Sequence, residues 1–241
     1  MRLGSLSEDQ SGIKDNTINL FLLVLWFGSL WGAVEALIGG LLHYILPPTI
    51  PGKFMIFLAI GILAWSYKKT GKPWMPVAIA LIAAPLKLFS AVVFRMPVNA
   101  PVILNPAFAI LAQGLGFSLV ALIVHKMTLP KSVKFLTAGA GAGASYSFIF
   151  AGLVAGVGLA VYPPMEVINE LGTKFPYWAK SISGLINFGS SSLIYSVIAA
   201  GIGGLTVGLL PFKVHPKLKP GTLASGSALW LTIFFVSSWL I

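Results

Sequence analysis

The sequence contains no cysteine, and only 9% of its 241 residues carry a charge. Without a thiol, the chain forms no disulfide, thiolate metal site, iron–sulfur cluster or cysteine nucleophile of its own. Soluble domains carry about a quarter charged residues, whereas here 57% of the residues are hydrophobic and the mean hydropathy is +0.91. A soluble core does not explain that much apolar sequence, so the composition predicts a membrane protein.

Sequence motifs of known catalytic chemistry are also missing. The chain has no H-E-x-x-H, Walker A or G-x-S-x-G pattern. Its three histidines, His43, His125 and His215, fall on different sides of the predicted membrane, which disfavours a haem held by two of them. We therefore predict no catalytic residue, no metal site and no cofactor, and no enzymatic activity.

Acidic residues are few, with 6 Asp and Glu against 16 Lys and Arg, which gives a formal net charge of +10. In a soluble protein this excess would suggest nucleic-acid binding. Here most of the basic residues lie in short segments between apolar runs, where they determine topology. We predict a lipid bilayer as the environment and no nucleic-acid partner.

The apolar runs predict an all-α, polytopic transmembrane bundle of six core helices with a candidate seventh helix at the C-terminus. About 20 apolar residues cross a bilayer once, and such runs lie at about 17–46, 53–67, 74–95, 106–127, 133–162, 182–211 and 224–240. Residues 1–16 form a short tail, 17–211 the six-helix bundle, and 212–241 a basic loop followed by the extra helix. Lysine and arginine are concentrated on alternate segments, which predicts a cytoplasmic N-terminus in the cell (inner) membrane.

Three ionisable side chains, Glu35, His43 and Lys87, lie inside the predicted spans. Charges in hydrocarbon are unfavourable, so such residues are candidates for function. Glu35 and Lys87 lie about 17 Å and about 12 Å below the outer ends of their helices, so the two side chains could meet. Gln113 and Asn187 fall in the same outer half of the predicted bundle.

This polar region allows two interpretations. The groups either line a pocket, open to the outside, for a substrate or an ion, or they are structural. In the structural interpretation Glu35 and Lys87 form a buried ion pair, while Gln113 and Asn187 provide hydrogen bonds between helices.

The dipeptide Asn105-Pro106 predicts the start of the fourth span, with Asn105 as N-cap and Pro106 at the first helical position. A helix N-terminus beside Arg95 would favour an anionic group on a ligand. The candidate substrate-binding residues are therefore Glu35, His43, Lys87, Arg95, Asn105, Gln113 and Asn187.

Small residues recur four apart in the first span, at Gly28, Gly32, Ala36 and Gly40. Such stripes let helix backbones approach closely, because lipid provides no hydrophobic drive for helix association. The stripe either packs inside the bundle or forms an interface with a partner subunit.

The strings WGAVEALIGGLLH (31–43), AAPLKL (83–88) and NPAFAILAQGLGFSL (105–119), together with the layout of spans, resemble the substrate-binding S components of energy-coupling-factor (ECF) micronutrient transporters. The resemblance implies a six-helix bundle that captures a vitamin, a related organic molecule or a metal chelate from the outer side. It also implies a transmembrane coupling subunit and two ATPases as partners. The sequence departs from that family in its candidate seventh span and in the small-residue pattern of its first span.

Two other functions remain open. The first is a stand-alone channel or proton-coupled carrier in which Glu35 titrates. The second is an intramembrane enzyme or assembly factor, which only the polar cluster supports.

Overall fold

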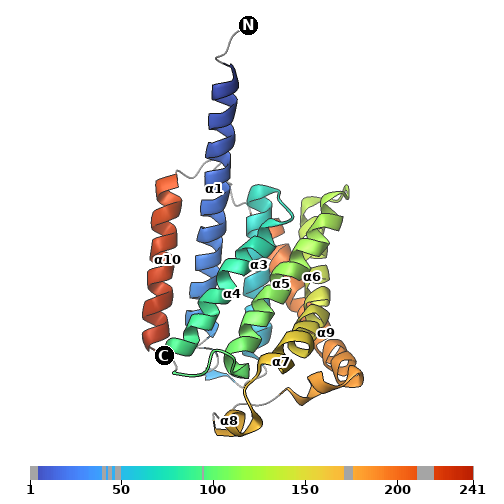
Figure 1. The fold of residues 1–241 in the computed structure, drawn as a ribbon. Helices are drawn as coiled ribbons and strands as arrows, with labels where there is room; N and C mark the ends of the chain where they lie inside the picture. Colours follow the sequence, from blue (N-terminus) through green and yellow to red (C-terminus); the bar gives the residue numbers. More distant parts are fainter. Residues whose placement is uncertain are drawn as a thin grey trace.

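The structure is a computed structural model that describes residues 5–39, 42, 45–46, 50–93, 95–170, 176–210 and 220–240. Within these ranges every regular element is a helix and no strand occurs, which confirms the predicted all-α class. The long helices are α1 (Ser5–Val34), α3 (Pro51–Thr70), α4 (Met75–Val93), α5 (Pro101–His125), α6 (Lys131–Leu153), α9 (Ile182–Leu209) and α10 (Pro220–Leu240) (Figure 1).

Five short elements are also defined in the described part of the chain. Two are π-helical: η1 (Glu35–Gly39) continues α1, and η2 (Val154–Gly158) continues α6 into α7 (Leu159–Val161). The connection from α7 to α9 contains α8 (Met165–Glu170) and the 3-10 turn η3 (Tyr177–Lys180).

The chain is a multi-pass membrane protein. Five helical segments are long and apolar enough to cross a bilayer, namely Ile18–Ile38, Met75–Val92, Pro101–His125, Lys131–Val161 and Ile182–Leu209. The helix α3 is 20 residues long but carries Lys53, Lys68 and Lys69, which lower its hydropathy. In α10 the apolar stretch Pro220–Val236 is shorter. Five of the seven predicted spans are thus helices that are long and apolar enough to cross a bilayer.

The helices α6 and α9 form the most extensive contact in the bundle, because small residues face each other across it. A Cβ atom on Gly139 or Gly143 would overlap the backbone carbonyls of Ala200 or Ser196, and one on Gly204 would overlap that of Phe135. Close packing of this kind associates helices where the hydrophobic effect is absent.

At the other side of the bundle, α1 lies between α4 and α10, and it runs in the same direction as α10 (Figure 1). The backbone of α1 approaches α4 at Gly28 and Gly32, where an added Cβ would meet Ile82 and Leu86. Ala36 is buried in a small cluster with Phe234 of α10.

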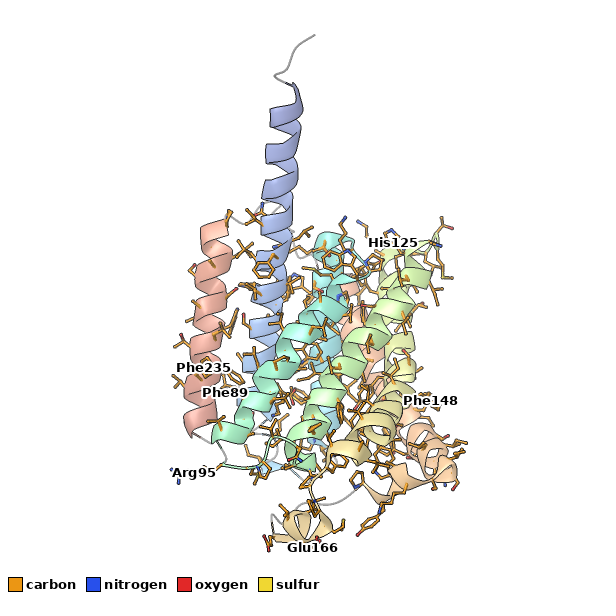
Figure 2. The ribbon with its side chains drawn as sticks, in the orientation of Figure 1. Phe89, Arg95, His125, Phe148, Glu166 and Phe235 are labelled. Atoms are coloured by element: carbon orange, nitrogen blue, oxygen red, sulfur yellow. The ribbon has the colours of Figure 1, made fainter. Side chains whose placement is uncertain are left out.

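The two ends of the bundle differ in chemistry. The end from which α1 projects carries His125, whose ring Nδ1 lies 3.1 Å from the Tyr67 hydroxyl (Figure 2). At the same end the Lys68 ammonium donates hydrogen bonds to the carbonyls of Val207 (2.6 Å) and Leu210 (2.9 Å), which closes the end of α9. Arg95 and Glu166 lie at the opposite end.

Candidate functional site

The structure brings Glu35 and Lys87 together. Glu35 follows α1 directly and Lys87 lies on α4, and the close approach of these helices at Gly32 allows the two side chains to meet. The Lys87 Nζ lies 4.0 Å from the Glu35 Oε1, and the side chains are 17% and 14% exposed. The pair is therefore loose and still accessible.

Glu35 is also the first residue of the π-helix η1. A π-helical turn contains one residue more than an α-helical turn, so it changes the direction in which the following side chains project, and such segments are frequent at functional sites. The second π-helix, η2, lies towards the same end of the bundle, at the end of α6. Both irregular turns therefore lie towards the end opposite the projecting N-terminus.

Gln113 lies on α5 and is buried in the bundle, with 5% of its surface exposed. The adjacent Gly114 packs against Ala80 of α4, seven residues before Lys87, or about 10 Å along the helix. Because α4 and α5 run in opposite directions and side chains lean towards the N-terminus of their helix, Lys87 and Gln113 lean towards each other. Within the described part of the chain, the Gln113 amide makes no hydrogen bond.

Two aromatic residues that we did not predict from the sequence belong to this region. Trp31 lies one turn before Glu35 and is completely buried, and its indole Nε1 has no hydrogen-bond partner among the described residues. Tyr146 on α6 packs against the same apolar core as Trp31, and its hydroxyl lies within electrostatic range of the Glu35 carboxylate. In the sequence, only the spacing of four residues between Trp31 and Glu35 could have linked Trp31 to this region. No feature of the sequence linked Tyr146 to it.

Asn105 is not the N-cap that we predicted. The helix α5 begins at Pro101 with Ala100 as its N-cap, and Pro106 lies inside it, so the earlier proline of the Ala100-Pro101 pair starts the helix. Asn105 instead accepts a hydrogen bond from the Tyr162 hydroxyl through its Oδ1. Burial raises the pKa of Tyr162 to about 12.

An aromatic layer lies next to this contact and joins η3 to α6 and α9. Trp178 stacks on Phe188 with 4.0 Å between the ring centroids, and Phe150 lies against both rings. The Asn99 side chain donates a hydrogen bond to the Val161 carbonyl (2.7 Å), which ties the α4–α5 connection to the end of α7. These contacts fix the connections at this end of the bundle.

The other predicted binding residues do not join the pair. Arg95 is exposed beyond α4, with a φ of 51°, and Asn187 is exposed on α9. His43 lies outside the described residues, as does Gly40 of the small-residue stripe. Gly28 and Gly32 are buried against α4, so this part of the stripe packs inside the chain.

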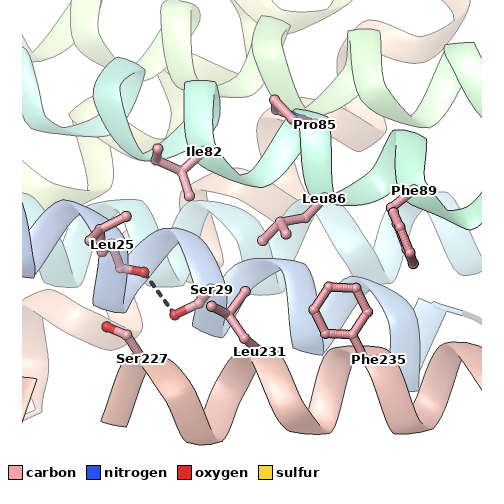
Figure 3. Close-up of a pocket in the computed structure, with 9 residues that line it drawn as sticks. All are labelled: Leu25, Ser29, Ile82, Pro85, Leu86, Phe89, Ser227, Leu231 and Phe235. Carbon is pink, nitrogen blue, oxygen red and sulfur yellow. Dashed lines mark hydrogen bonds between the residues drawn. The ribbon is translucent and has the colours of Figure 1, made fainter. Parts of the chain in front are cut away.

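An apolar groove of about 350 Å³ lies between α1, α4 and α10 (Figure 3). The Ser29 and Ser227 hydroxyls at the groove donate to Leu25 and Leu223 of their own helices, so the groove offers no free donor. Its lining residues are Leu25, Ser29, Ile82, Pro85, Leu86, Phe89, Ser227, Leu231 and Phe235.

Among the described residues, no three His, Asp or Glu side chains are grouped so that they could hold a metal ion. Comparisons with models of protein families, with curated proteins and with solved structures found no match to this chain.

Proposed function

We propose that this membrane protein is a substrate-binding subunit that captures a small micronutrient, a vitamin-like molecule or a metal chelate, from the outer side. The observation that carries the proposal is the accessible Glu35–Lys87 pair, whose side chains make no hydrogen bond within the described part of the chain. Polar groups at membrane depth normally satisfy one another, because unpaired ones are unfavourable there. Here hydrogen-bonding capacity is left over, which favours a ligand site over a purely structural ion pair.

The outer-side entry follows from the topology that we propose. The basic segments put the N-terminus in the cytoplasm of a cell (inner) membrane, so Arg95, Glu166 and the Tyr162–Asn105 contact face outside. The pair lies nearer that end than the N-terminal end, because Glu35 follows α1 and Lys87 is six residues from the end of α4.

Uptake through such a subunit requires partners that supply energy, since the sequence lacks a nucleotide-binding motif. We propose a transmembrane coupling subunit and ATPases for this role. The resemblance to ECF S components supports this assignment, and the Gly28 and Gly32 surface is already covered by α4, so a partner would use another face.

Two alanine variants test ligand capture. We expect Lys87→Ala and Glu35→Ala each to lose a small molecule that copurifies with the wild-type chain in mild detergent, as detected by native mass spectrometry, while both variants still elute as folded protein. Loss of folding in both variants, with no copurified molecule in the wild type, would identify Glu35 and Lys87 as a structural ion pair.

The π-helical position of Glu35 favours a second candidate, a stand-alone proton-coupled carrier that uses this residue. Liposomes that contain only this chain separate the two functions. Substrate flux driven by a proton gradient supports the carrier, and a strict requirement for ATPase partners supports the binding subunit.

A further inference from the structure

The two charges of the Glu35–Lys87 pair cancel. Apart from Lys131 and Lys134 at the start of α6, the membrane-spanning segments of the described chain contain one acidic residue, Glu35, and one basic residue, Lys87, which face each other at 4.0 Å. Arg95, which we expected to add positive charge, is exposed beyond α4. The helix N-terminus that we expected at Asn105 begins instead at Pro101. Arg95 thus does not join the pair, and the pair itself carries no net charge.

The hydrogen-bonding groups of the pair are far from saturated. A carboxylate accepts about four hydrogen bonds and an ammonium donates three. Within the described chain neither side chain makes a hydrogen bond: Lys87 lies 4.0 Å from Glu35, and Glu35 is also within electrostatic range of the Tyr146 hydroxyl. Gln113 on the neighbouring helix α5 is 95% buried, and its side chain makes no hydrogen bond within the described residues. The Glu35 carboxylate can therefore accept further hydrogen bonds, and the adjacent Lys87 ammonium can donate them.

We propose that this site selects a net-neutral small molecule with a hydrogen-bond donor next to a hydrogen-bond acceptor, as in a zwitterion, an amide or a lactam. The donor faces Glu35 and the acceptor faces Lys87. An ion of either sign would leave one uncompensated charge at membrane depth, which is unfavourable in a medium of low dielectric. The proposal rests on the proposed function and defines its ligand class.

The test uses pairs of compounds that share a ring and differ in charge, namely benzamide with benzoate and uracil with orotate. Binding to the purified full chain in detergent is measured by equilibrium dialysis. We expect the wild type to retain the neutral member of at least one pair about tenfold better than the anion, a difference of about 1.4 kcal/mol. Glu35→Gln leaves Lys87 unpaired, so we expect this variant to reverse the preference towards the anion.

The double variant Glu35→Gln/Lys87→Gln is the control in case the single variant misfolds. It leaves neither Glu35 nor Lys87 as an unpaired charge and keeps hydrogen-bond donors and acceptors at both positions. We expect it to bind more weakly than the wild type but still to prefer the neutral member. A wild-type preference for the anion would overturn the inference and leave the proposed binding function intact. No binding of any compound to any of the three proteins would count against both.

Discussion

At the scale of single residues, burial of the Tyr162 phenol should make stability depend on pH. The pKa of the Tyr162 phenol is raised by burial to about 12, against about 10 in an unfolded chain. The folded state therefore holds this proton more tightly, so its contribution to stability is complete below about pH 10 and is lost as the pH rises towards 12.

The variant Tyr162→Phe tests this dependence. Because phenylalanine has no proton to lose, we expect its melting temperature in detergent to fall less than that of the wild type between about pH 9 and about pH 12. Parallel curves for the two proteins would show that Tyr162 does not contribute. Tyr177, which is exposed on η3, provides the matched control as Tyr177→Phe, and we expect its curve to follow the wild type.

Individual residues also show what the sequence could predict. Glu35 and Lys87 were identifiable because charges are rare in apolar runs, and a depth estimate from helix rise placed them near each other. The start of α5 could not be identified from the sequence, because Ala100-Pro101 and Asn105-Pro106 both place a proline where a helix can begin. Trp31 and Tyr146 were missed because an aromatic residue in an apolar span gives no sign of what its polar atom meets.

At the scale of elements, the end of α9 depends on a lysine from α3. Lys68 donates to two carbonyls that the last turn of α9 leaves unpaired. We expect Lys68→Met to lower the free energy of unfolding by about 1–2 kcal/mol, measured by thermal or denaturant unfolding in detergent. Lys72→Met is the control, because Lys72 is exposed, and we expect it to have no measurable effect.

The α6–α9 contact should tolerate no side chain at its closest point. In Gly143→Ala the new Cβ would overlap the Ser196 carbonyl, and we expect a loss of about 2 kcal/mol or more as the helices separate. Gly152 lies on the same helix with nothing within 4 Å of an added Cβ. Gly152→Ala should therefore be neutral or stabilising by about 0.5 kcal/mol. Equal losses in both variants would contradict tight packing as the cause.

Elements differ in how well the sequence predicted them. The six core helices follow from apolar runs, whose lengths a bilayer dictates, and the structure has a helix at each run. The π-helices η1 and η2 were not predicted, because one extra residue per turn hardly changes an already apolar sequence. The side on which a small-residue stripe packs was likewise undetermined, since glycine at every fourth position fits any close helix contact.

At the scale of the whole molecule, the absence of cysteine makes the orientation directly measurable. Single-cysteine variants need no prior removal of native thiols. We expect Glu170→Cys, exposed on α8, to react with a membrane-impermeant maleimide in intact cells. Thr128→Cys, exposed between α5 and α6, should react only after permeabilisation. The reverse pattern would place the N-terminus outside and would make the Glu35–Lys87 pair accessible from the cytoplasm.

The π-helix at Glu35 also has a consequence for how this sequence can change over time. A π-helical turn is an α-helix with one residue too many, so deletion of a single residue from 36–39 would restore a regular helix. Each residue after the deletion would then rotate by about 100° relative to α1. Insertions and deletions in this short stretch, more than substitutions, would therefore alter which side chains accompany Glu35, and related chains of different ligand preference are expected to differ here in length.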